Sequence, residues 1–207
     1  MGRGQGIDED KRATLRRFAA VGAASPLAKF ADGEAAAESA SPVREAIAGY
    51  LASTPGAHFS KLRDDLQLGT GEAQHHLRRL LDASVVESHR DGDYRRFFPA
   101  EQFSDFERVA LSYLRRDTPR GMVLTLLRDP DATGGDLADA LGVSQATVSK
   151  YAAELDAAGL LSREDGYAVE HPETLVVLLT RYADSFDADT VDFAADAADY
   201  VRYDPPE

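Results

Sequence analysis

Arginine, glutamine and hydroxyl side chains gather on two stretches whose spacing predicts helices, and on a short segment that follows the first stretch. Arg and Gln are the side chains suited to paired hydrogen bonds with the edges of guanine and adenine. Arg and Tyr also suit contacts with phosphates. The candidate contact residues of the first stretch and its following segment are Thr70, Gln74, His75, Arg78, Arg79, Arg90, Tyr94, Arg95 and Arg96. Those of the second stretch are Ser144, Gln145, Thr147, Lys150 and Tyr151.

Simpler interpretations exist for several of these residues. Arg78 and Arg79 could be solvated helix surface, and Gln74 could serve only as a helix former. His75 and His76 could suggest a metal site, but adjacent positions on a helix point about 100° apart. No third ligand is placed near them in the sequence, so we expect no metal site there.

The composition argues against most enzymatic chemistry. The chain has 207 residues and no Cys, which excludes disulfides, thiolate metal ligands and cysteine nucleophiles. The sequence also lacks a phosphate-binding glycine motif, a zinc-protease helix and a nucleophile elbow. We therefore expect a protein that is not an enzyme and that uses no cofactor.

The formal net charge is −13, which by itself argues against a nucleic-acid partner. The charge is unevenly spread, however. Residues 58–99 carry seven basic and seven acidic side chains, whereas residues 119–171 carry four and nine. Any surface that faces phosphates is therefore expected in the first half. The acidic, Asp-rich and Lys-poor composition resembles that of proteins from salt-accumulating halophiles.

The N-terminal region allows two interpretations. Residues 14–23, with Arg16-Arg17 before a short apolar run, resemble a twin-arginine export signal. Pro26 and Lys29 interrupt that run, which favours a surface helix over residues 10–24. No apolar run reaches the ~18 residues of a membrane helix. We expect a cytoplasmic protein with no membrane partner.

The chain repeats itself after a small, polar linker at residues 32–41. A shift of 75 residues aligns 44–86 with 119–161 and gives eight identities, among them Leu62 with Leu137 and Leu80 with Leu155. Apolar positions and turn residues keep the same phase in both copies, so we interpret the match as an internal repeat.

Each copy shows the pattern helix, helix, turn, helix, hairpin, which is that of a winged helix-turn-helix. In the second copy Thr133 and Ser144 are expected helix N-caps, and Gly142 and Gly159 are expected to end helices. Its third helix is expected over 144–158, and that of the first copy over Thr70–Ala83. Both hairpins are expected to turn at Asp-Gly.

These elements predict a mainly α protein with small β-hairpin wings: two tandem winged helix-turn-helix modules plus linking and C-terminal helices. The expected boundaries are an N-terminal helix or arm with its linker at 1–41, a first module at 42–100, a connecting helix at 101–118, a second module at 119–171 and C-terminal helices at 172–207.

The second copy resembles a known family. Three runs of the second copy are similar to the helix-turn-helix of MarR/ArsR-type regulators. They are Gly135-Asp136-Leu137-Ala138, Leu141 to Lys150, and Gly159-Leu160-Leu161. Residues 69–80 resemble the first module of archaeal tandem winged-helix regulators, although Ser84-Val85 stands where the pattern has Gly-Leu. The resemblance covers about 42–171.

The resemblance implies binding of double-stranded DNA, with the third helix of a module in the major groove. The sequence therefore favours a sequence-specific transcriptional regulator. The alternative is a winged-helix module that assembles protein complexes without touching DNA. The apolar stripe Leu175, Leu178, Leu179, Tyr182 and Phe186 needs a covering surface. That surface is either the helix at 102–116 or a second chain, and we favour a homodimer.

Overall fold

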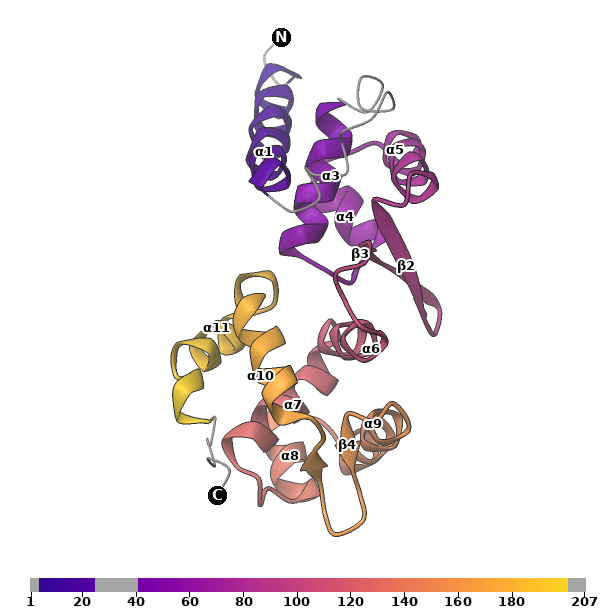
Figure 1. Ribbon diagram of the computed structural model, residues 1–207. Coiled ribbons are helices and arrows are strands. Elements are labelled where there is room, and N and C mark those ends of the chain that lie inside the picture. The colour runs from indigo at the N-terminus through magenta and orange to yellow at the C-terminus, as the bar shows by residue number, and fades with distance from the viewer. Residues whose placement is uncertain (1–3, 25–40, 201–207) are drawn as a thin grey trace, which may run out of the picture. The chain divides into compact units, whose positions relative to one another are not determined.

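The computed structural model describes residues 4–24 and 41–200 (Figure 1). These residues form two compact units, one ending at Arg108 and the other beginning at Val109 within helix α6 (Asp105–Leu114). Two expected segments lie partly outside the described residues: most of the linker at 32–41 and the end of the helical segment at 189–202.

In the N-terminal unit, helix α1 (Gly4–Ala24) runs alongside α3 (Pro42–Ser53) (Figure 1). Pro42 occupies the first turn of α3, where its missing N–H costs nothing. Phe18 of α1 meets Tyr50 of α3 edge to face, with ring centroids 5.3 Å apart. The helix expected over 10–24 is therefore present, begins six residues earlier, and is fixed to the unit by aromatic packing.

The first winged helix continues with α4 (Phe59–Asp65), α5 (Thr70–Asp82) and the strands β2 (Val86–Asp91) and β3 (Tyr94–Pro99). The sheet has the order β1-β3-β2, because a short strand β1 (Ala57–His58) adds to β3. Strand β1 was not expected from the sequence. The hairpin turns at Gly92, whose φ of 57° lies in the left-handed region that favours glycine.

One apolar core holds this unit together. Leu62 of α4 and Leu77 and Leu80 of α5 are buried on the inner faces of their helices. They pack with Ile47, Tyr50 and Leu51 of α3 and with Phe97 of β3. Because the buried residues of α5 recur at helical spacing, the polar residues between them must face outward.

The second winged helix lies in the C-terminal unit. It consists of α7 (Asp117–Arg128), α8 (Gly134–Leu141), α9 (Gln145–Ala157) and the short strands β4 (Leu161–Ser162) and β5 (Ala168–Val169). Thr133 and Ser144 cap α8 and α9, and Gly142 and Gly159 adopt positive φ at helix ends. These local predictions from the sequence are confirmed.

The repeat is visible in the element bounds. Helices α3 and α7 have the same length and begin 75 residues apart, and so do α5 and α9. Strands β2 and β4 begin at the same offset, although β4 is shorter. The predicted fold class, a mainly α chain with two small hairpin wings, is confirmed.

The C-terminal helices complete the second unit. They are α10 (Pro172–Arg181), α11 (Ala188–Ala195) and the 3-10 turns η2 (Ala183–Ser185) and η3 (Ala197–Asp199). The chain's own residues bury four of the five side chains of the stripe, Leu175, Leu178, Leu179 and Tyr182. The fifth, Phe186, stacks against the guanidinium of Arg115, which lies 4.2 Å from the ring centroid. This corrects the argument for a dimer: the apolar stripe is covered within the unit and needs no second chain.

Candidate nucleic-acid interface

The outer face of α5 collects five of the candidate contact residues. All five are exposed: Thr70, Gln74, His75, Arg78 and Arg79. Ala73, Leu77 and Leu80 are buried on the opposite face and fix the rotation of the helix. The face therefore presents donors and acceptors on a rigid helix, as contact with base edges requires.

The two arginines of α5 carry charge that no described residue of the unit neutralises. Arg78 and Arg79 form no ion pair with any residue that the structure describes. Lys61 and Arg63 of α4, by contrast, pair with Asp65 and Asp64 at 2.8 and 2.7 Å. The positive charge of the first winged helix is thus concentrated on α5 and on the wing.

The wing presents two more such arginines. Arg90 and Arg95 are exposed, and neither is ion-paired within residues 4–24 and 41–200. Arg95 Nε donates to Ser88 Oγ at 3.0 Å, and its guanidinium lies 5.4 Å from the Phe97 ring centroid. Tyr94 is 53% exposed and lies beside the His58 ring, with centroids 5.4 Å apart. These contacts orient the side chains without pairing the arginine charge with a carboxylate.

Arg96 does not belong to this surface, which corrects the expectation from the sequence. Its side chain is 3% exposed, and Nε donates to Asp91 Oδ2 at 2.5 Å. A second guanidinium nitrogen donates to the carbonyl of Gly56 at 3.1 Å. Successive strand residues point to opposite faces, so Arg96 points to the face opposite that of Arg95, where Asp91 and Gly56 cover it. That alternation was the signal in the sequence. Arg96 instead holds the wing to the segment before β1.

Two histidines near the interface are biased toward the neutral form. Burial, helped by the charges of Arg96 and Lys61, lowers the pKa of His58. Burial is the largest cause that lowers the pKa of His76, and the charges of the neighbouring His75 and Arg44 lower it further. His58 Nδ1 accepts a hydrogen bond from Lys61 N at 3.2 Å and so caps α4. Arginines thus supply the fixed positive charge of this surface.

On the second winged helix, the candidate residues lie on the first half of the third helix, from its N-cap Ser144 to Tyr151. Gln145 and Lys150 are exposed on α9. Ser144 Oγ accepts from Thr147 N at 3.1 Å and lies 2.9 Å from Thr147 Oγ1, so both hydroxyls take part in capping the helix. Lys150 Nζ lies 5.2 Å from the Tyr151 ring centroid and 3.8 Å from Glu154 Oε1.

Most positive charge of the second winged helix is neutralised by carboxylates. Arg120 bonds Asp117 and Asp187, and Arg128 bonds Asp189 at 2.9 Å. Glu154, beside Lys150, also accepts from Arg116 at 3.1 Å. Among the basic residues of 119–171, only Arg163 has no ion pair within the described part of the chain. The two winged helices are therefore electrostatically unlike.

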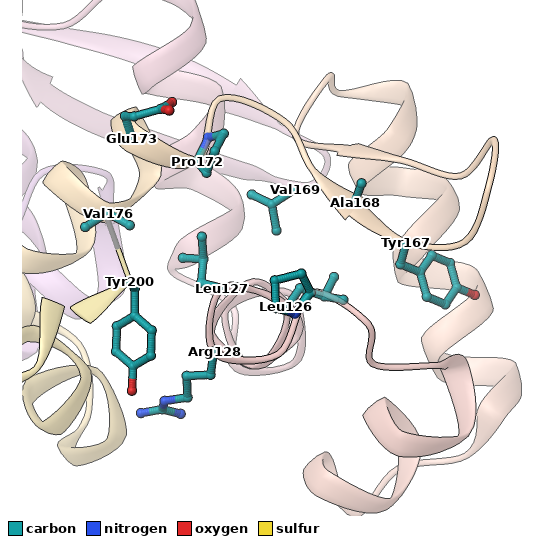
Figure 2. A pocket seen from close by; sticks show the side chains of 11 residues that line it. Leu126, Leu127, Arg128, Tyr167, Ala168, Val169, Pro172, Glu173, Val176 and Tyr200 are labelled. Atoms are coloured by element: carbon teal, nitrogen blue, oxygen red, sulfur yellow. The ribbon is translucent and has the colours of Figure 1, made fainter. Parts of the chain in front are cut away.

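The C-terminal unit also contains a pocket of about 380 Å³. It lies between the end of α7, strand β5 and the start of α10, and Figure 2 shows Leu127, Val169 and Val176 around it. Arg128 lines one side next to Tyr200 (Figure 2). The hydrogen bond with Asp189 raises the pKa of Arg128, so this guanidinium is already engaged by a carboxylate.

No group of three or more His, Asp or Glu side chains among the described residues is placed to hold a metal ion. None of their helices is both long and apolar enough to cross a membrane.

Comparison with known proteins assigns a class to this architecture. Residues 41–111, which include α3 to β3, match a family described as an N-terminal HTH domain. Residues 121–167, which include α8, α9 and β4, match the MarR family. With the fold described above, these matches identify two tandem winged helix-turn-helix modules, the first similar to that N-terminal HTH domain and the second similar to the MarR family.

One curated relative is an uncharacterized HTH-type transcriptional regulator of the archaeon Methanocaldococcus jannaschii. It is 28% identical over 124 residues, which are 59% of this chain and 31% of the relative. The matched part thus spans less than a third of the relative's length. No solved structure matches the chain.

Proposed function

We propose that this protein is a transcriptional regulator that binds double-stranded DNA sequence-specifically and grips it mainly through the first winged helix. The proposal is based on the contrast in unpaired positive charge between the two winged helices. The first winged helix exposes four arginines without carboxylate partners among the described residues, at Arg78, Arg79, Arg90 and Arg95. The second winged helix has ion-paired most of its positive charge.

The physical chemistry of DNA binding gives these arginines distinct roles. Contacts with phosphates supply most of the affinity, because each one releases counterions from the duplex. Arg90 and Arg95 on the wing suit such contacts. Arg78, Arg79 and Gln74 lie on the helix that fits the major groove, where their planar groups can form paired hydrogen bonds with bases.

The second winged helix is proposed as a weaker contributor. Gln145, Thr147, Lys150 and Tyr151 can contact bases or sugars, with Ser144 near a phosphate, but the surrounding acidic charge opposes binding. At high salt this matters less, because counterion release contributes less there and direct contacts carry more of the affinity. The alternative function, assembly of protein complexes, is favoured for this second module alone by its excess of acidic residues.

A direct test compares matched variants of the full chain. A duplex is first selected from a random library by the wild-type protein, and its affinity is then measured by fluorescence anisotropy over a KCl series. Arg78→Ala/Arg79→Ala is expected to weaken binding by about 1–3 kcal/mol per lost contact and to relax the preference for the selected sequence, because these two arginines are proposed to contact bases. Lys150→Ala is expected to lose less.

Arg181→Ala is the control for this experiment. Arg181 is an exposed residue of α10, and its loss changes the net charge as Lys150→Ala does. It is expected to leave the affinity and the salt slope unchanged. Equal losses from the α5 pair and from Lys150 would contradict the asymmetry between the modules. A folded wild-type protein that selects no duplex sequence would contradict the function itself and favour the assembly hypothesis.

A two-fold homodimer belongs to the same proposal, because symmetric regulators match symmetric operators. The buried C-terminal stripe no longer supports it, so the proposal stands on symmetry alone. Light scattering of the full chain in molar KCl measures the mass directly. A monomer over the concentration range of DNA binding would remove the dimer and leave the DNA-binding proposal intact.

A further inference from the structure

Helix α1 lies outside both family matches, yet it contacts the third helix of the first winged helix. Lys11 Nζ of α1 donates to Glu72 Oε2 of α5 at 2.9 Å. The two residues are 61 positions apart in the sequence. Neither was among the candidate residues, because nothing local in the sequence links them.

Apolar packing fixes the direction of Lys11. Leu15 and Phe18 are partly buried against the core of the unit, and Phe18 contacts Tyr50. Lys11 precedes them by four and seven residues and therefore shares their face of the helix. Its side chain is 27% exposed, so the ammonium group is held beside α5 and is only partly solvated.

Glu72 lies in the first turn of α5 and has a second structural role. Its Oε2 also accepts from Gly69 N at 3.3 Å, which satisfies one of the free N–H groups at the start of the helix. The hydrogen bond from Lys11 is the largest cause that lowers the pKa of Glu72. The carboxyl group is therefore ionised, with its charge matched by Lys11.

An ionised carboxylate at this position opposes DNA binding unless it is neutralised. The N-terminal residues of the third helix are those that approach the bases in helix-turn-helix proteins. Glu72 lies between Thr70 and Gln74, which both belong to the exposed face of α5. A charge there lies within one screening length, about 8–10 Å, of phosphates on a docked duplex.

We propose that Lys11 is a positioning residue for DNA binding, and that it makes α1 part of the DNA-binding element by neutralising Glu72 at the start of the third helix. This inference rests on the proposed function. It gives α1 a role in affinity as well as in covering the core, and it explains why an acidic residue is tolerated at the start of α5.

The test is a double-mutant cycle in duplex binding with Lys11→Gln, Glu72→Gln and the double variant of the full chain. Lys11→Gln leaves Glu72 unmatched and is expected to weaken binding about threefold to tenfold at 0.15 M KCl. Glu72→Gln keeps the acceptor that caps α5, because glutamine serves there as well. It is expected to bind as tightly as wild type or more tightly.

The double variant separates electrostatics from structure. If Lys11 acts by neutralising charge, the double variant recovers to within about twofold of wild type, because no unmatched carboxylate remains. If the pair only holds α1 in place, the double variant is as weak as Lys11→Gln, and the proposal is overturned. The unfolding of each variant is monitored by circular dichroism, which tests whether the compared proteins are folded.

Arg16→Gln is the matched control on the same helix. Arg16 is exposed and has no ion pair within the described residues, so this change removes one positive charge without uncovering a carboxylate. Its expected effect is below twofold, and a loss as large as that of Lys11→Gln would overturn the proposal. If the wild-type protein binds duplex but the cycle shows no coupling between Lys11 and Glu72, the role of Lys11 is refuted and the proposed function still stands. If folded wild type binds no duplex, the proposed function fails with it.

Discussion

Arg90 and Arg95 lie directly opposite each other on β2 and β3, so the first wing places two like charges face to face. Such a pair destabilises a hairpin by a few tenths of a kcal/mol to about 1 kcal/mol. Ser88 takes one hydrogen bond from Arg95, but no carboxylate among the described residues offsets the repulsion. A phosphate between the two guanidinium groups would offset it.

Arg90→Gln is expected to act in opposite directions on stability and on DNA binding. Relief of the repulsion leaves the free energy of unfolding unchanged or raises it by up to about 0.5 kcal/mol. Loss of a phosphate contact weakens duplex binding and lowers the salt slope by about one. Urea unfolding and anisotropy measure the two effects. Weaker binding in parallel with lower stability would mean that the wing had merely lost its structure.

The buried pair of Asp91 and Arg96 is expected to control the stability of the wing. Asp91→Asn leaves the charge of Arg96 inside the unit and should cost about 3–5 kcal/mol in free energy of unfolding. Asp91→Leu/Arg96→Met replaces the whole pair by apolar side chains and should cost much less. Urea unfolding of both variants tests this. A loss below about 1 kcal/mol for Asp91→Asn would contradict the burial of the pair.

Lower pH is expected to destabilise the N-terminal unit through its histidines. The pKa values of His58 and His76 are lowered in the folded protein, whereas the unfolded chain keeps the ordinary value of 6.5. Below pH 6.5 the unfolded chain therefore binds protons that the folded protein does not, so stability falls with pH until the folded groups also protonate. More than about one pH unit above 6.5 these two groups contribute almost no pH dependence, because both states are then deprotonated.

Thermal unfolding between pH 7.5 and 5.5 measures this effect, since carboxyl groups titrate mostly below that range. His76→Gln removes one of the two groups without touching the helix cap made by His58. It should make the dependence on pH shallower. An unchanged slope in His76→Gln would show that His76 does not contribute.

Leu179 is expected to stabilise the C-terminal unit within a single chain. It is fully buried on α10, so Leu179→Ala should cost about 2–5 kcal/mol, independent of protein concentration. Val177 is 60% exposed on the same helix, and Val177→Ala should change stability by less than about 0.5 kcal/mol. A cost that grew with dilution would show instead that α10 forms a subunit interface.

Local signals in the sequence determined much of this fold. Periodic apolar residues predicted the third helices, and α5 and α9 begin within one residue of the predicted positions. Thr133 and Ser144 cap helices, and Gly142 ends one, because their side chains or backbone freedom act within three or four residues. The spacing of polar and apolar residues along α5 likewise predicted which of its side chains face outward.

Contacts between distant segments were decided only by the tertiary structure. Strand β1 exists because it pairs with β3 some 40 residues later, and the same pairing surrounds Arg96 and buries it against Gly56. The stripe on α10 is covered within its own unit. Lys11 meets Glu72 because α1 packs on α3. Periodicity and capping act over a few residues, whereas burial and charge pairing depend on which remote segments the folded chain brings together.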